Sequence, residues 1–169
     1  IIWSDHLAQR WYEAALQDAG WYVFAPVIWE RACPTPRMSG DGPTSAADYM
    51  TIARPRRRLP KARMGSRPGK YVARHMNGGQ YAATRWHPGG KCLQATRHVI
   101  RDYALPTDLV ADPCSGGGTT ARACQLEGRS FIGSEMDPAT HAKAIERLAQ
   151  PFTAALFNDT PDATQEPLL

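Results

Sequence analysis

Residues 109–120, LVADPCSGGGTT, carry the side chains and spacing most suited to chemistry. A short apolar run enters an Asp-Pro turn and three glycines, and two threonines then open a helix. Glycines let a ligand approach the backbone where a Cβ would clash, and a helix N-terminus offers unpaired N–H groups to an anion. A second apolar run, 131–133, leads to Glu135, which lies seventeen residues after Gly118. In nucleotide-binding βαβ units such an acid accepts hydrogen bonds from ribose hydroxyls, so the stretch predicts a pocket for a nucleoside with a small charged group.

Two other kinds of glycine-rich loop do not match. No Lys follows the glycines, which excludes a P-loop, and the residues after Gly118 do not match the dinucleotide pattern GxGxxG. A glycine-rich turn without a ligand is the plain alternative. Three consecutive glycines, two threonines and a correctly spaced acid favour a binding loop over that alternative.

The same residues resemble a known family. Residues 112–120 resemble the Asp-Pro-Phe-x-Gly-x-Gly-Thr-Thr motif of amino-group DNA methyltransferases, with Cys114 in place of Phe. Glu135 resembles the acid of their Gly-x-Glu motif, and residues 87–93 resemble their His-Pro-x-x-Lys-Pro-Leu segment, with Cys92 at the second Pro. The order of segments is that of the β class, in which the catalytic half precedes the cofactor half. The resemblance implies adenine-N6 or cytosine-N4 methylation with S-adenosylmethionine as the cofactor.

The resemblance also implies a role for individual residues. Asp112 would hold the amino group of the cofactor, and Gly116 and Gly118 would let it pass close to the backbone. Thr119 and Thr120 would cap the helix and bind the carboxylate. Each residue also has an alternative without a ligand. Asp112 could simply form a turn, and Thr119 and Thr120 could simply cap the helix. Lys91 could be a surface lysine and His87 a core histidine. The whole implied cofactor set is Asp112, Pro113, Cys114, Gly116, Gly118, Thr119, Thr120 and Glu135, with Lys91 and His87 near the methionine end.

The catalytic tetrapeptide of that family, Asp/Asn/Ser-Pro-Pro-Tyr/Phe/Trp, is absent here, because no two of the fourteen prolines are adjacent. In the β class it would lie upstream of residue 1, so we expect a chain that lacks its N-terminal portion and is inactive alone. The catalytic residues are then unknown, and the choice between adenine and cytosine stays open. The main hypothesis is a fragment of a site-specific DNA methyltransferase of restriction-modification type.

Two other functions stay open. One is a non-catalytic module that binds S-adenosylmethionine or DNA, or the cofactor half of an enzyme completed by an upstream segment. The other, which the basic stretch described next disfavours, is an RNA or small-molecule methyltransferase. The upstream coding sequence would discriminate the first of these from a methyltransferase fragment.

Positive charge is concentrated in residues 49–101, which contain no Asp or Glu and hold 13 of the 20 Lys and Arg. Such a distribution is expected of a surface that contacts a phosphate backbone, and a solvated loop or an acidic protein partner is the alternative. The expected DNA contacts are Arg56, Arg57, Arg58, Lys61 and Arg63. DNA is therefore the expected partner, and a homodimer stays open.

The expected fold is α/β, a Rossmann-like methyltransferase sheet with helices on both faces, here without its upstream strands. Periodicity predicts strands at 1–4, 22–29, 49–53, 109–111 and 130–134, and helices at about 5–19, 92–103, 119–126 and 137–148. The first helix would pack through Leu7, Trp11, Ala15 and Leu16, residues 32–46 would form a loop, and residues 54–86 show no sustained period. The expected domains are 1–53 as the second half of the catalytic subdomain, 54–86 as a basic, irregular DNA-contacting insertion, 87–150 as the cofactor-binding subdomain and 151–169 as a loose tail.

Composition excludes some other classes. No run of eighteen apolar residues could span a membrane, and the four cysteines have neither CxxC pairing nor metal-ligand spacing. A reducing, cytoplasmic setting is therefore expected, without a metal site. Trp3, Trp29 and Trp86 are expected to pack in the core rather than to stack on bases.

Overall fold

The structure is a computed structural model that describes residues 1–35, 40, 42–55, 66–73 and 89–151. Its elements are β1 (Ile2–Ser4), α1 (Gln9–Asp18), β2 (Trp21–Val23), β3 (Val27–Thr35), β4 (Ser45–Thr51), β5 (Ala53–Pro55), β6 (Lys70–Ala73), α2 (Leu93–Tyr103), β7 (Leu109–Asp112), α3 (Thr119–Glu127), β8 (Ser130–Gly133) and α4 (Pro138–Ala149). Among these residues, no helix is both long and apolar enough to cross a bilayer.

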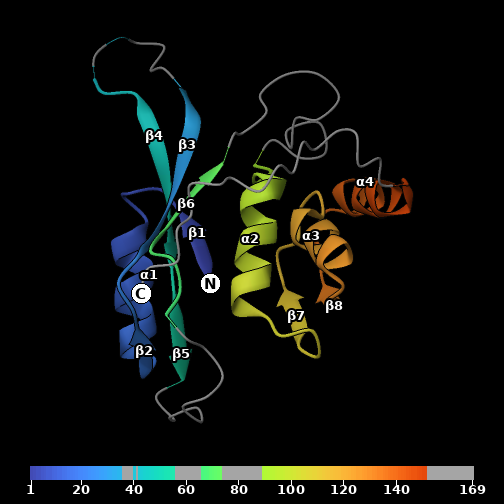
Figure 1. The fold of residues 1–169 in the computed structure, drawn as a ribbon, viewed down its shortest axis with the longest axis horizontal. Coiled ribbons are helices and arrows are strands. Elements are labelled where there is room, and N and C mark those ends of the chain that lie inside the picture. Colours follow the sequence, from blue (N-terminus) through green and yellow to red (C-terminus); the bar gives the residue numbers. More distant parts are fainter. Residues whose placement is uncertain (36–39, 41, 56–65, 74–88, 152–169) are drawn as a thin grey trace.

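The strands of this part of the chain form three sheets. A four-stranded sheet has the order β1-β4-β3-β6, in which β4 is antiparallel to β1 and β3 while β6 is parallel to β3. The β2–β5 pair is antiparallel, and the β7–β8 pair is parallel. Figure 1 shows α1 on one side of the four-stranded sheet and α2 on the other, with α3 beyond α2. These mixed sheets with helices on both sides agree with the predicted α/β class.

Helix α2 lies between two apolar clusters. On one side, Trp29 of β3 and Tyr71 of β6, which are 2% and 1% exposed, pack in a cluster with Ala95 and Val99 of α2. Trp3 packs against Trp29 in a T-shaped pair with ring centroids 5.8 Å apart. The prediction that these two tryptophans belong to the core is therefore confirmed, whereas Trp86 lies outside the described residues.

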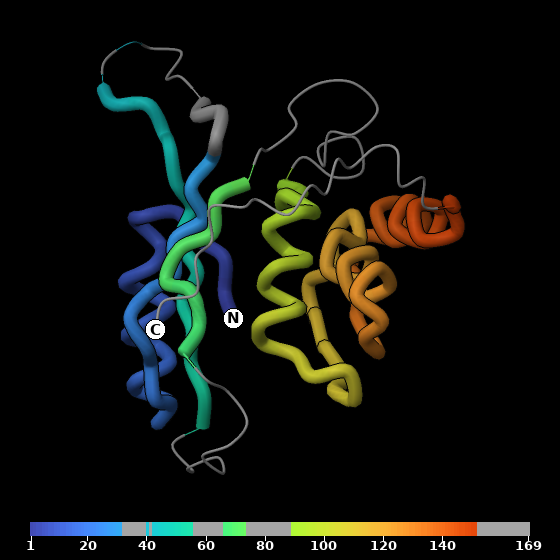
Figure 2. Tube along the Cα trace, in the orientation of Figure 1, coloured from blue at the N-terminus to red at the C-terminus, as the bar shows by residue number. Residues whose placement is uncertain are grey.

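The second cluster joins α2 to the β7–β8 pair. Ile100 of α2 packs with Ala123 and Cys124 of α3, and the partly buried Val110 and Phe131 extend this cluster onto β7 and β8. Figure 2 follows the chain through this unit, in which β7, α3, β8 and α4 succeed one another. Helix α2 therefore positions the β7–β8 unit against the four-stranded sheet.

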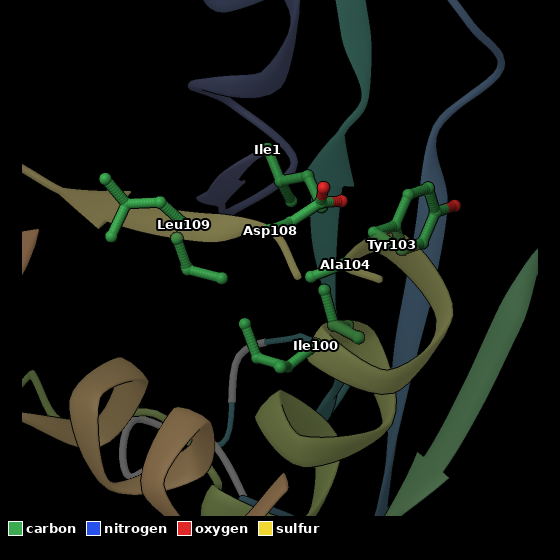
Figure 3. A pocket seen from close by; sticks show the side chains of 8 residues that line it. Ile1, Ile100, Tyr103, Ala104, Asp108 and Leu109 are labelled. Atoms are coloured by element: carbon green, nitrogen blue, oxygen red, sulfur yellow. The ribbon is translucent and has the colours of Figure 1, made fainter. Parts of the chain in front are cut away.

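A cavity of about 340 Å³ lies where β1, the C-terminal part of α2 and the start of β7 meet. Ile1, Ile100 and Leu109 line it from these three elements, as Figure 3 shows. Leu109 stands at the opposite end of β7 from Asp112. The cavity is therefore separate from the glycine-rich loop that follows Asp112.

Several expectations about the elements were wrong. The strands expected at 22–29 and 49–53 are each divided between two sheets: the first range holds part of β2 and part of β3, and the second holds part of β4 and part of β5. Helix α1 lies on one side of the four-stranded sheet, but it buries none of its residues, and Trp11 is 68% exposed. The loop expected at 32–46 is shorter, because β3 runs on to Thr35 and pairs with Ser45 at the start of β4. A register shift between Glu30 and Thr35 interrupts this ladder, and such irregularities accommodate a proline like Pro34.

A further wrong expectation concerns residues 54–86, the segment without a sustained period. Four of its residues form β6, which pairs with β3 in parallel, and Tyr71 and Ala73 alternate into the core. This strand depends on its pairing with β3, which lies far from it in the sequence, so no local pattern signals it. The domain boundaries themselves stay predictions.

Candidate functional site

The candidate site lies at the carboxyl ends of β7 and β8. These strands are parallel, and their last residues, Asp112 and Gly133, are paired in register. Two loops therefore leave the pair at the same edge: residues 113–118, called here the glycine loop, and residues 134–137, called the acid loop. Ligands of α/β proteins commonly bind at this edge of a sheet.

Two serines connect the loops through backbone groups. The N–H and the hydroxyl of Ser115 both donate to the carbonyl oxygen of Ser134, at 2.9 and 3.0 Å. In return, the Ser134 N–H donates to the Asp112 carbonyl at 3.1 Å, and its hydroxyl donates to the Pro113 carbonyl at 2.8 Å. These four hydrogen bonds hold the two loops in one fixed arrangement.

Glu135 contacts the glycine loop directly. Its Oε2 accepts a hydrogen bond from the N–H of Gly116 at 2.8 Å, and its Oε1 accepts one from the N–H of Asp137 at 3.0 Å. Gly116 has a φ of +50°, a left-handed conformation that favours glycine. The structure therefore brings together the acid and the glycines that the sequence pattern pairs.

The rim of the site combines a second carboxylate with exposed apolar groups. Asp112 is half-buried, and its Oδ1 accepts a hydrogen bond from the N–H of Cys114 at 3.1 Å. Pro113 and Cys114 are exposed, and Met136, directly after Glu135, is 96% exposed. The edge thus presents two carboxylates and a thioether to solvent.

The base of the glycine loop packs on α4. Gly118 is buried, has a φ of +71°, and a Cβ on it would stand 3.1 Å from the Cβ of Ala144. Gly118 is also the residue that precedes the first turn of α3. This packing is a structural reason for glycine at position 118, independent of any ligand.

The expectation that the two threonines cap α3 was wrong. Gly118 occupies the cap position, so Thr119 and Thr120 fall inside the first turn of the helix. The hydroxyl of the buried Thr119 instead accepts a hydrogen bond at 3.0 Å from Nη1 of Arg147 on α4. Glycine has no side chain to cap the helix, and the Thr119 hydroxyl makes this interior contact instead of a capping one.

The expected start of α4 is confirmed. Asp137 precedes Pro138 at the first position, and its Oδ2 accepts hydrogen bonds from the N–H and hydroxyl of Thr140 at 2.8 and 2.6 Å. These hydrogen bonds from Thr140 hold the pKa of Asp137 below its usual value. Asp137, the last residue of the acid loop, is thus held in place at the start of α4 by these hydrogen bonds.

Of the remaining expected residues, the structure describes Lys91 alone, and none of the contacts seen in the described part of the chain joins Lys91 to this edge. Lys91 lies half-buried just before α2. The hydrogen bond from the N–H of Ala8 foremost holds the pKa of Asp5 below its usual value, and the charge of Lys91 makes the smallest contribution to that shift. His87 and the five cations expected to contact DNA lie outside the described residues. Strand β5, which precedes these cations, lies at the opposite end of the molecule in Figure 1 from the N-terminus of α2.

Sequence reasoning missed three residues of this site. Ser115, Ser134 and Arg147 all bond to backbone carbonyls of the two loops. Every residue has a backbone carbonyl, so the sequence pattern does not predict which carbonyl a side chain will contact. For Arg147, the one available signal is its spacing of three residues from Ala144, which places both on one face of α4.

Comparison with known proteins agrees with this arrangement. The sequence profile of the N6/N4 DNA methylases matches residues 1–146. The type II methyltransferase M.Cfr9I of Citrobacter freundii is 27% identical over 146 residues, which cover 79% of this chain and 47% of that protein. M2.MboI of Moraxella bovis is 28% identical over 131 residues, covering 72% and 48%. The chain thus spans about half the length of the curated relatives it matches.

Solved structures support the fold. The M1.HpyAVI–SAM complex superposes with a TM-score of 0.71 at 24% identity, covering 88% of this chain and 73% of that one. The cytosine-N4-specific PvuII DNA methyltransferase superposes with a TM-score of 0.66 at 20% identity, covering 83% and 56%. The predicted Rossmann-like methyltransferase fold is therefore confirmed, and with most of its residues matched by the family profile, the chain belongs to the N6/N4 DNA methylase family.

Proposed function

We propose that this chain is the S-adenosylmethionine-binding part of a DNA methyltransferase that modifies the exocyclic amine of adenine or cytosine. The observation that carries the proposal is the contact between Glu135 and Gly116 at the carboxyl ends of two parallel strands. Family membership supports it, as does the likeness of the fold to M1.HpyAVI, which was solved as a complex with SAM.

The residues at this edge fit such a cofactor. Glu135 accepts N–H groups at the point where the two loops meet, and a carboxylate is the kind of acceptor that the hydroxyls of a ribose would bind. Asp112 would accept from the amino group of the methionine part, and Met136 offers an apolar surface to a planar base. Gly116 has no Cβ, so a ligand can approach the backbone of the glycine loop there. When bound, the cofactor would supply a methyl group on a positively charged sulfur.

The target base imposes a separate requirement. An exocyclic amine inside a duplex cannot reach a pocket at the edge of a sheet, so the base must leave the stack at a cost of a few kcal/mol. Contacts with phosphates hold the DNA while this happens. For this role we keep the proposal of Arg56, Arg57, Arg58, Lys61 and Arg63, supported by the absence of acidic residues from 49 to 101.

Calorimetric titration with S-adenosylmethionine tests the cofactor site. We expect the Glu135→Ala variant to bind roughly 10- to 150-fold more weakly, the equivalent of about 1.5–3 kcal/mol for hydrogen bonds to a charged group. Glu146→Ala is the matched control, because Glu146 is an exposed acid on α4. Circular dichroism must show all three proteins folded. Equal affinities of the Glu135 variant and the wild type would reject the ribose contact.

A second candidate is a binding module without catalysis, or the cofactor half of an enzyme completed by another segment. The absence of adjacent prolines in the sequence favours it, because the catalytic tetrapeptide of the family contains two. We expect no methyl transfer when the 169-residue chain is incubated with radiolabelled cofactor and mixed-sequence DNA. Clear incorporation at stoichiometric protein would show that this chain contains its own catalytic residues.

A further inference from the structure

We infer that Arg147 is a positioning residue, which holds the glycine loop from beneath in the shape that receives the cofactor. This inference rests on the proposed function, and it adds a residue from the last turn of α4 to a site otherwise built by β7, β8 and their loops. Three features of the molecule bear on it: where the guanidinium donates, what else α4 buries and how the loop backbone is bonded.

The guanidinium of Arg147 bonds two successive parts of the loop and helix. Its Nη1 donates to the carbonyl oxygen of Gly117 at 2.9 Å and to the hydroxyl of Thr119 at 3.0 Å. The N–H of the same 117–118 peptide donates to the carbonyl of Ser115 at 2.9 Å. Both polar groups of this peptide are therefore bonded, which fixes the plane of the peptide between Gly116 and α3.

The buried face of α4 serves this contact. Ala144 and Arg147 are the two residues that α4 buries, at 5% and 7% exposure, and they lie one turn apart. Ala144 fills the space in front of Gly118, so the same helix face both packs on the loop and bonds to it. An arginine suits this position because its planar fork offers several fixed donors, where lysine offers one compact charge.

The interior position has an electrostatic consequence. Burial lowers the pKa of Arg147 to about 10, and the nearby charge of Arg122 contributes. Arg147 therefore stays protonated at neutral pH and keeps its donors. A buried cation behind the N-terminus of α3 also adds to the positive end of that helix dipole, which favours an anionic group in front of the loop.

Paired substitutions separate positioning from stability. Arg147→Met removes the donors while keeping a long apolar side chain. Arg122→Met is the matched control, because Arg122 is 8% exposed and bonds Gln125 and the carbonyl of Leu148 near the end of α4. In folded samples, we expect Arg147→Met to weaken S-adenosylmethionine binding about tenfold or more, as for loss of a charge-assisted hydrogen bond, and Arg122→Met to leave it unchanged. Arg147→Lys should fall between Arg147→Met and wild type.

Hydrogen exchange supplies a measurement that needs no cofactor. The amides of Gly116 and Gly118 donate within the site, to Glu135 and Ser115. Arg147→Met should accelerate their exchange relative to the amides of α2, and Arg122→Met should not. If Arg147→Met fails to fold, Thr119→Val, which removes one of the two acceptors and keeps the charge, takes its place with the same expected direction.

The two assays also distinguish this inference from the proposed function. A wild-type chain that binds no S-adenosylmethionine would contradict the proposed function, and hydrogen exchange would still decide the role of Arg147. Loop amides that exchange alike in the Arg147 and Arg122 variants, or equal losses of affinity in both, would overturn the positioning role. Protected loop amides in wild type and faster exchange specific to Arg147→Met would support it.

Discussion

At the scale of single residues, Gly118 and Gly128 form a matched pair. Both are left-handed, with φ of +71° and +65°, but a Cβ on Gly118 would press on Ala144 while one on Gly128 would meet open space. We expect Gly128→Ala to cost about 1–2 kcal/mol of unfolding free energy from the backbone alone. Gly118→Ala should cost about 1–3 kcal/mol more from overpacking. Denaturant titration measures both unfolding free energies. Equal losses of stability in the two variants would mean that α4 moves to accommodate the added methyl group at no cost.

Site residues that belong to a recognisable pattern of residue types could be predicted from the sequence. Residues whose side chains bond to backbone carbonyls could not. The glycines and their spacing from Glu135 predicted that the two loops lie together, and the hydrogen bond between Gly116 and Glu135 confirms that proximity. Cofactor binding by these residues stays a prediction. Ser115, Ser134 and Arg147 bond to carbonyls, and the inward turn of the Thr119 hydroxyl depends on the left-handed Gly118, which the sequence pattern alone does not reveal.

At the scale of elements, Glu127 connects α2 to α3. Its Oε1 accepts from Nε of Arg97 at 2.7 Å and from Nη2 of Arg101 at 3.0 Å. Burial alone would raise the pKa of Glu127, but hydrogen bonds from Arg101 and Arg97 outweigh it and hold the pKa below the ordinary value of 4.5. A carboxyl with a lowered pKa in the folded state stabilises above its unfolded pKa, and the contribution is lost as pH falls through the folded value.

This sign gives a prediction about acid stability. The unfolding free energy of the wild type should fall below about pH 4.5, and Glu127→Gln should be less stable at neutral pH with a flatter acid limb. Glu146→Gln changes the same charge at an exposed site and should keep the wild-type pH profile. Chemical denaturation at a series of pH values measures this. Parallel curves for wild type and Glu127→Gln would mean that the two arginine contacts do not stabilise the fold.

Elements marked by local sequence signals were predicted well, and elements that depend on contacts between distant segments were not. Helices α2, α3 and α4 and strands β7 and β8 lie within a residue or two of their expected ranges, because apolar spacing, Gly128 and Asp137 mark them. Strand β6 is set by pairing with β3, which is a contact between distant segments. The exposed face of α1 was also not predictable, since its apolar spacing is that of a packed helix.

At the scale of the whole molecule, the uneven charge predicts how DNA binding responds to salt. Each phosphate contact releases counterions, so replacing Arg56, Arg57 and Arg58 by Gln should flatten the slope of log affinity against log salt by roughly two to three units. Affinity should fall for all sequences alike. The control makes the same change to Gln at Arg10 and Lys143, two exposed cations outside residues 49–101. It should leave the slope unchanged. If the triple variant has the same slope of log affinity against log salt as the wild type, the DNA must bind to another surface.

The central claim is that S-adenosylmethionine binds at the carboxyl ends of β7 and β8. Titration of the ¹⁵N-labelled chain with S-adenosylmethionine, followed by amide chemical shifts, tests it most directly. The account predicts the largest shifts at the glycine loop and the acid loop, above all at Gly116, Glu135 and Met136. Smaller shifts should follow at Thr119, and none at the cavity beside Leu109. A saturable titration whose shifts cluster around that cavity, or the absence of any shift at Gly116 and Glu135, would contradict the account.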